Sequence, residues 1–172
     1  MFLLKTVDPA KATGKVAEIY AVFPKEIGVP KTMELLSASP AYLERQMDNI
    51  AYYRSHKKLT PPLLAAIRYL AAENCGHAFC TVFNGGILKK MGLTDQDLAQ
   101  LRADPQNANL EENEATMLAF VKKTLEAPES VTSADIEALR GQGYEDSDIF
   151  DAVGQAAGMI AGAVFYKAFA RD

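Results

Sequence analysis

Both cysteines and one of the two histidines of the chain fall within six residues, at Cys75, His77 and Cys80. Glu73 precedes this segment and Asn84 follows it. A thiolate is a nucleophile, and an imidazole one turn away can hold it as an ion pair and lower the thiol pKa below its free value of about 8.5. A carboxylate one turn before the imidazole can orient the ring and keep it basic. The segment therefore predicts a reactive thiol at Cys80, assisted by His77.

These residues could lie on one continuous helix or on two helices separated by a break. On a continuous helix the four side chains other than Cys75 would project within about 60° of one another, and Cys75 would lie on the opposite face. The two sulfur atoms would then point apart, because residues five positions apart are separated by about 7.5 Å along the axis. A stop at Asn74-Cys75-Gly76 removes this obstacle, since glycine tolerates the positive φ of a helix C-terminus. We expect a new helix to begin near His77, with Cys80 in its first turn, where the positive dipole end favours a thiolate.

A structural role for the same residues is the alternative. Free cysteines usually behave as small buried hydrophobic residues, and a histidine beside them can be a hydrogen-bonded core residue. A closed zinc site would need both cysteines, His77 and the remote His56, so we expect no metal, and nothing in the sequence calls for a cofactor. His56 itself lies in a basic turn and is expected to be exposed at a helix C-terminus.

The elements that must position the segment are predicted to be helical. Three prolines follow a side chain that can cap a helix, which suits the first helical position: Pro9, Pro40 and Pro61. Apolar residues then recur every three or four positions, and no alternating run indicates a strand. Further helices are predicted over residues 94–103, 111–126, 132–140 and from 147 to about 170. The fold class is therefore all-α, and adjacent helices over 61–70 and 79–88 present the cysteine segment.

Composition narrows the classes of function. The chain has 172 residues, 49% of them hydrophobic, and a net charge of −4. This length is sufficient for one domain over residues 1–172 without a metal or disulfide. No basic stripe interleaved with aromatic residues is present, so we expect no nucleic-acid partner. The longest apolar run, Met159 to Phe165, is far shorter than the roughly 20 residues of a spanning helix, and no signal peptide is recognised. We expect a cytoplasmic protein that does not cross a membrane.

The last predicted helix carries glycines at every fourth position, at Gly154, Gly158 and Gly162. A glycine inside a helix costs about 1 kcal/mol relative to alanine, so three on one face call for a packing reason. Such a face lets another helix backbone approach closely. That helix could belong to the same subunit or to a second copy.

Several short motifs follow one another from about Gly28 to Phe165. They are Gly28-Val29-Pro30, Ser39-Pro40, Lys58-Leu59-Thr60, the cysteine segment, Gly92-Leu93-Thr94, and Ala138-Leu139-Arg140-Gly141-Gln142-Gly143-Tyr144 before an alanine-rich helix. In this order they resemble the carboxymuconolactone decarboxylase and alkylhydroperoxidase-D-like (AhpD-like) superfamily. The resemblance implies an AhpD-like helical domain and a homo-oligomer, either a trimer or a hexamer.

The peroxidase-type members of that superfamily have a glutamate, eleven further residues and then Cys-x-x-Cys-x-x-x-His. There the second cysteine attacks peroxide, the first resolves it, and the glutamate and histidine relay protons. Cys80 matches the attacking cysteine. The resolving cysteine, the histidine and the glutamate are replaced, respectively, by His77, Asn84 and Ala65. Cys75 lies two positions before the resolving position, and Glu73 could supply a carboxylate only from a different point on the chain.

The resemblance implies a thiol-dependent antioxidant enzyme of the alkylhydroperoxidase or peroxiredoxin type. Cys80 would be oxidised by a small-molecule peroxide to a sulfenic acid, which condenses with Cys75 or with a thiol of a partner protein. Glu73 and Asn84 would orient their neighbours. Two alternatives stay open: a small-molecule lactone decarboxylase or isomerase without redox chemistry, and a non-catalytic oligomeric member of the fold.

Overall fold

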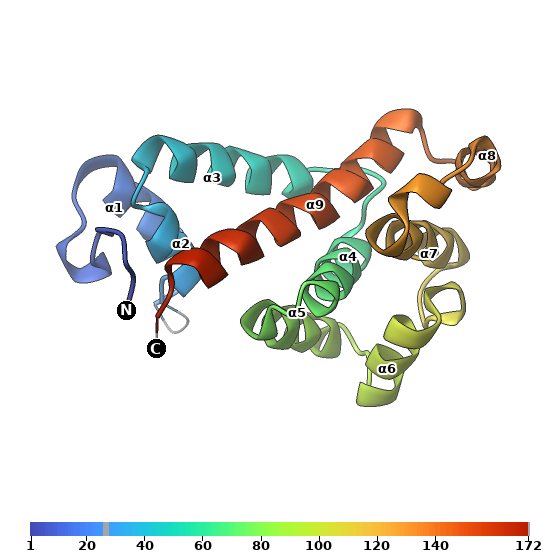
Figure 1. Ribbon diagram of the computed structural model, residues 1–172, viewed down its shortest axis with the longest axis horizontal. Coiled ribbons are helices and arrows are strands. Elements are labelled where there is room, and N and C mark those ends of the chain that lie inside the picture. The colour runs from blue at the N-terminus through green and yellow to red at the C-terminus, as the bar shows by residue number, and fades with distance from the viewer. Residues whose placement is uncertain (26–27, 172) are drawn as a thin grey trace. The chain divides into compact units, whose positions relative to one another are not determined.

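The computed structural model describes residues 1–25 and 28–171 (Figure 1). These residues contain helices and a single isolated bridge between Phe2 and Ala170, which confirms the predicted all-α fold. The α-helices are α1 (Gly14–Tyr20), α2 (Lys31–Leu36), α3 (Pro40–Arg54), α4 (Pro61–Asn74), α5 (Ala78–Lys90), α6 (Asp95–Ala103), α7 (Glu112–Glu126), α8 (Ser133–Gly141) and α9 (Asp146–Phe169).

Proline begins two of the three helices predicted from it. Pro40 and Pro61 are the first residues of α3 and α4, and the N–H of Leu63 donates to the Thr60 hydroxyl at 3.3 Å, which caps α4. Pro9 begins only a three-residue 3-10 turn, because the chain becomes extended directly after it and α1 starts later. The four helices predicted further along the chain correspond to α6, α7, α8 and α9 within one or two residues.

The chain divides into two compact units. Unit 1 consists of residues 1–55 and 164–172, and unit 2 of residues 56–163. The core of unit 1 joins α1 and α3 through four buried side chains: Val16, Ile19, Tyr20 and Leu43. Its two chain segments are also joined at their ends, where the N–H of Leu3 donates to the carbonyl of Phe169 at 2.9 Å. The single domain expected from the sequence stays a prediction.

Unit 2 is organised around α4, which contacts α5, α6 and α7. The side chains of α4 are buried at nearly every position from Leu63 to Ala72, so this helix has an apolar surface all round. Fully buried partners come from the neighbouring helices: Leu88, Leu101, Met117, Leu118 and Val121. Figure 1 shows α5 following α4 directly in the green part of the ribbon. The cysteine segment is the connection between these two helices.

Helix α9 is apolar along much of its length. Its 24 residues include an 18-residue window of mean hydropathy 1.4, of which 22% is buried, so by length and composition alone it could cross a membrane. One such helix is weak evidence for a membrane protein, because core helices pass the same test. A β-carbon built at Gly158 or Gly162 meets no described atom within 4 Å, so close packing inside the chain is not found at these two glycines. The homo-oligomer stays a prediction that light scattering would test.

Candidate active site

The chain breaks between α4 and α5 at Gly76, whose φ of +61° is in the left-handed region. The N–H of Gly76 donates to the carbonyl of Glu73 at 3.1 Å, and the N–H of His77 donates to the carbonyl of Ala72 at 2.8 Å. These two bonds form a Schellman motif, which ends a helix and satisfies its last carbonyls. The structure therefore confirms the predicted break, and with it the placement of Cys80 in the first turn of a new helix.

Both thiols are unbridged and half-buried. Cys75 lies in the connection, where its Sγ contacts the carbonyl of Ala72 at 3.6 Å, and Cys80 is the third residue of α5. Burial raises the pKa of Cys80 to about 11, and Cys75 adds to this rise, whereas the guanidinium of Arg68 opposes it. The lowered thiol pKa predicted from the sequence is therefore not found.

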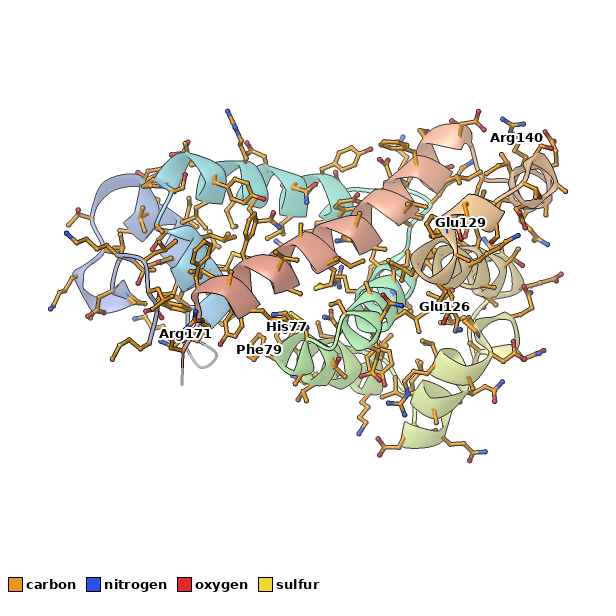
Figure 2. All side chains as sticks on the ribbon, viewed as in Figure 1. His77, Phe79, Glu126, Glu129, Arg140 and Arg171 are labelled. Atoms are coloured by element: carbon orange, nitrogen blue, oxygen red, sulfur yellow. The ribbon has the colours of Figure 1, made fainter. Side chains whose placement is uncertain are left out.

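His77 is the N-cap residue of α5 and is buried. Its Nδ1 accepts a hydrogen bond from the backbone N–H of Cys80 at 3.4 Å. This contact joins the imidazole to the backbone of Cys80 and not to its sulfur, and it satisfies one of the first N–H groups of the helix. Figure 2 labels His77 at this end of α5, together with Phe79. His77 thus fixes the turn that carries the thiol.

Asn84 is fully buried one turn after Cys80. Its side-chain amide donates to the carbonyl of Cys80 at 2.9 Å, and its Oδ1 accepts from Nε of Arg68, also at 2.9 Å. The amide therefore ties α5 to α4 beside the thiol. Gly85, the next residue, allows this close approach, because a β-carbon there would lie 3.3 Å from the ring of Tyr69 on α4.

Arg68 is the site residue that the sequence analysis missed. It is the single charged residue of α4 between Pro61 and Glu73, within an otherwise buried apolar run. Burial lowers the pKa of its guanidinium, and the neighbouring Cys80 raises it. Among the described residues no carboxylate pairs with Arg68. The signal available in the sequence was a lone charge inside an apolar helix, which requires a specific neighbour.

Glu73 does not join the other four predicted site residues. Its carboxylate accepts from Nη1 of Arg102 on α6 at 3.2 Å. The break at Gly76 ends the helical phase on which the predicted stripe of Glu73, His77, Cys80 and Asn84 depended, so that stripe does not form. Within the described residues, hydrogen bonds link His77 and Asn84 to the backbone of Cys80, Cys75 lies in the connection before them, and the carboxylate of Glu73 has a different partner.

Two shallow pockets lie beside this region. One, of about 310 Å³, is lined by Glu73, Gly76, Ala78, Thr81 and Val82. The other, of about 260 Å³, is lined by Leu70, Glu73, Asn74, Arg102, Lys122, Leu125 and Glu126. Over residues 1–25 and 28–171, no group of three or more His, Cys, Asp or Glu residues is arranged to hold a metal ion.

A second polar cluster surrounds the beginning of α4. His56 was expected to be exposed, and this is wrong: 9% of its side chain is accessible, and its Nε2 lies 3.3 Å from the carboxylate of Asp151. Nδ1 of His56 accepts the backbone N–H groups of Lys58 at 3.2 Å and Leu59 at 3.0 Å. Nε2, on the other side of the ring, faces the carboxylates. Asp148 also lies 3.7 Å from this Nε2.

Two solved structures share the arrangement of these helices. The first is described as an alkylhydroperoxidase AhpD core, an uncharacterized peroxidase-related protein from Ralstonia eutropha JMP134; the TM-score is 0.77 at 23% identity over 98% of this chain and 90% of that chain. The second is an uncharacterized peroxidase-related protein from Silicibacter sp. TM1040, with a TM-score of 0.75 at 19% identity over 96% of this chain and 86% of that chain. The fold is that of the AhpD core. No family model matches the sequence, and no curated protein matches it either.

The AhpD-like fold agrees with the resemblance found in the sequence. At these identities the likeness establishes the fold alone. What the AhpD-like chain can do must therefore be argued from its own site. That site offers two neighbouring thiols, a capping imidazole, a buried amide and one guanidinium.

Proposed function

We propose that this AhpD-like chain is a thiol-dependent peroxidase in which Cys80 attacks the peroxide and Cys75 resolves the product. The observation that supports this is the break at Gly76, after which Cys80 lies in the first turn of α5 while Cys75 lies in the connection just before that helix. The positive end of the α5 dipole and the charge of Arg68 both favour a thiolate at Cys80. Burial works against it, so the thiolate forms as the reaction proceeds and is not stored in the resting enzyme.

The reaction balances with the two thiols of the chain. The sulfur of Cys80 bonds to the terminal oxygen of a hydroperoxide ROOH, the O–O bond breaks, and the thiol proton leaves with the alkoxide as the alcohol ROH. Cys80 is then a sulfenic acid. The thiol of Cys75 displaces its hydroxyl as water and forms a disulfide. A dithiol reductant protein returns both cysteines to thiols by exchange and becomes oxidised itself.

The other site residues serve as positioning residues in this scheme. His77 caps the turn that carries Cys80, and Asn84 holds the backbone of Cys80 and the guanidinium of Arg68. Glu73 has no step, because its carboxylate is engaged by Arg102. The chain thus differs from the peroxidase motif in which a glutamate and a histidine relay protons.

Mass spectrometry after one equivalent of tert-butyl hydroperoxide tests this function. We expect a loss of two hydrogens that links Cys75 to Cys80 in the wild-type chain. Cys80→Ser should abolish peroxide consumption. The matched variant Cys75→Ser should keep the first step and leave a sulfenic acid on Cys80 that dimedone traps, with turnover slowed or shifted to an external thiol. If neither cysteine is modified, the redox function is wrong.

A small-molecule enzyme without redox chemistry is the second candidate. One observation favours it: the pKa of Cys80 is raised to about 11, so the resting residue is a neutral thiol at neutral pH. A chain of this kind would survive peroxide with both thiols intact. The same mass spectrum therefore separates the two candidates.

A further inference from the structure

The guanidinium of Arg68 is half-buried in unit 2 and has one hydrogen-bond partner among the described side chains. Its Nε donates to Oδ1 of Asn84 at 2.9 Å, and Nη1 and Nη2 have no acceptor within the described residues. The groups that face it are the thiol of Cys80 and the amide of Asn84, both on α5. The two terminal NH₂ groups are therefore available to an acceptor that does not come from the described chain.

Other arginines of the same unit are paired with carboxylates. Arg102 contacts Glu73 at 3.2 Å, and Arg140 contacts Asp146 at 2.8 Å, although these side chains are more exposed than Arg68. Removing a guanidinium from water is unfavourable unless an opposite charge compensates it. A neutral thiol at Cys80 does not supply that charge. The positive charge of Arg68 is thus uncompensated in the resting chain.

We propose that Arg68 is the anchor of an anion site beside Cys80, and that this site takes the carboxylate of an organic molecule. Nη1 and Nη2 form a planar pair of donors that matches the two oxygens of a carboxylate. One guanidinium carries one charge, so it compensates a carboxylate fully but a phosphate dianion only in part. Asn84 is the positioning residue, because its Oδ1 accepts from Nε of Arg68 and so fixes the guanidinium.

The surface next to the site favours an anion with an apolar body. Phe79 and Phe83 precede Cys80 and Asn84 by one residue each, and their rings stack on α5 with centroids 6.1 Å apart. They are 44% and 46% exposed, and Val82 between them is 76% exposed. Exposed aromatic surface on the helix that carries Cys80 and Asn84 can bind the hydrocarbon part of a carboxylic acid.

This inference rests on the proposed function in naming a substrate class, since it makes the substrate a hydroperoxide that carries a carboxylate. Anchoring the carboxylate on Arg68 would bring the peroxide oxygen of such a molecule toward the sulfur of Cys80. The binding site itself can be tested without any peroxide.

Alkylation of Cys80 by two matched reagents is that test. Iodoacetate and iodoacetamide carry the same iodomethyl carbon, but only iodoacetate has a carboxylate. Their rates are compared in the Cys75→Ser background, where Cys80 is the only thiol. A change in thiol pKa affects both rates equally, so the ratio of iodoacetate to iodoacetamide rates reports recognition of the carboxylate. We expect Arg68→Gln to lower this ratio about tenfold, as for the loss of a charge-assisted hydrogen-bond pair.

Two further variants separate the site from general charge effects. Lys89→Gln removes the same charge from the exposed end of α5 and should leave the ratio within twofold. Arg68→Lys keeps the charge but loses the paired donors of the guanidinium, so we expect the ratio to fall about threefold. This variant replaces Arg68→Gln in the test if Arg68→Gln does not fold. Benzoate should slow the reaction of iodoacetate with the Cys75→Ser protein that keeps Arg68, and should have no effect on the protein that also carries Arg68→Gln.

A ratio that is unchanged in both Arg68 variants, or lowered equally by Lys89→Gln, would overturn the anion site. The two proposals can fail separately. If peroxide leaves both cysteines intact while the ratio still depends on Arg68, the peroxidase function is wrong and the anion site stands. If the disulfide forms but the ratio does not depend on Arg68, the peroxidase stands and the carboxylate substrate is wrong.

Discussion

The beginning and the middle of α4 have opposite electrostatic arrangements. At the beginning of the helix the polar groups compensate one another: the ammonium of Lys58 donates to the carbonyl of Gly143 at 2.6 Å and lies 3.7 Å from Asp148, while Thr60 bonds to the carboxylate of Glu114. In the middle of the helix Arg68 has an amide and a thiol beside it, and no carboxylate among the described residues. One helix thus carries a compensated cluster and an uncompensated one.

This difference distinguishes charged groups that stabilise the fold from a charged group that can act on a ligand or a reacting thiol. A cluster whose donors and acceptors are matched stabilises the fold and leaves nothing for a ligand. A cluster with one unmatched cation stores unfavourable energy that a bound anion or a developing thiolate can release. We therefore expect substitutions at the beginning of α4 to change stability, and substitutions around Arg68 to change reactivity.

The largest expected effect is on the alkylation rate of Cys80. Because burial raises the pKa of Cys80 to about 11, its alkylation by iodoacetamide should rise about tenfold per pH unit, or about a thousandfold between pH 7 and 10. Stopped alkylation with peptide mass spectrometry measures this rate for Cys80 alone. A small free thiol is the control and levels off near pH 9. A plateau in the alkylation rate of Cys80 below pH 8 would show that this residue is already a thiolate in the resting chain.

The same shift predicts how stability depends on pH. The folded pKa of Cys80 is raised, so its contribution is fully present below the unfolded value of about 8.5 and is lost as pH rises through about 11. Denaturant unfolding in this pH range should show the loss in the wild-type chain. Cys80→Ser should remove that part of the dependence.

The next effect is expected from disrupting the compensated cluster at the beginning of α4. Asp148→Ala removes the carboxylate that accepts from the N–H of Glu145 at 2.7 Å and lies beside Lys58 and His56. We expect the free energy of unfolding to fall by about 3 kcal/mol, since buried partners lose their acceptor. Asp146→Ala, in the same turn of α9 but largely exposed, is the matched control and should change little. Equal losses in the two variants would mean that the cluster does not stabilise the unit. Neither variant should alter the alkylation of Cys80.

A smaller effect is expected at the break between α4 and α5. Gly76→Ala forces a β-carbon into a φ of +61° and should lower the free energy of unfolding by about 1–2 kcal/mol. Gly86→Ala is the control, because Gly86 lies inside α5 and a β-carbon there meets nothing within 4 Å. That variant should be neutral or stabilising. Disulfide formation after peroxide should slow only in Gly76→Ala.

The smallest expected change in stability is at Tyr144, near Glu114 and Asp148. Its hydroxyl is buried without a hydrogen-bond partner among the described residues, and burial first, then these two carboxylates, raise its pKa to about 12. Tyr144→Phe should therefore alter the free energy of unfolding at pH 7 by less than about 0.5 kcal/mol. The stability lost in the wild type between about pH 10 and 12 should be absent in the variant. A loss above 1 kcal/mol at pH 7 would reveal a partner for this hydroxyl.

Local signals in the sequence predicted the framework of the site, and long-range contacts decided its chemistry. Thr60-Pro61 and Gly76 determine where helices start and stop through their own backbone preferences, so the break was predictable. The partner of Glu73 lies 29 residues away on α6, and the carboxylates that bury His56 come from α9. No spacing rule identifies such partners. The raised pKa of Cys80 could not be predicted from spacing for the same reason, because burial is its main cause.

The connectivity of the two units also affects the order in which they can fold. Unit 2 is one uninterrupted segment, whereas unit 1 needs residues from both ends of the chain, including a hydrogen bond between Met1 and Arg171 that spans 170 positions. A ribosome makes the first part of unit 1 earliest, yet that unit cannot close until Val164 and the residues after it have emerged. The core of unit 1 at Val16, Ile19, Tyr20 and Leu43 can therefore form before the cysteine-bearing unit has been made, whereas the contacts of unit 1 with residues 164–171 form last.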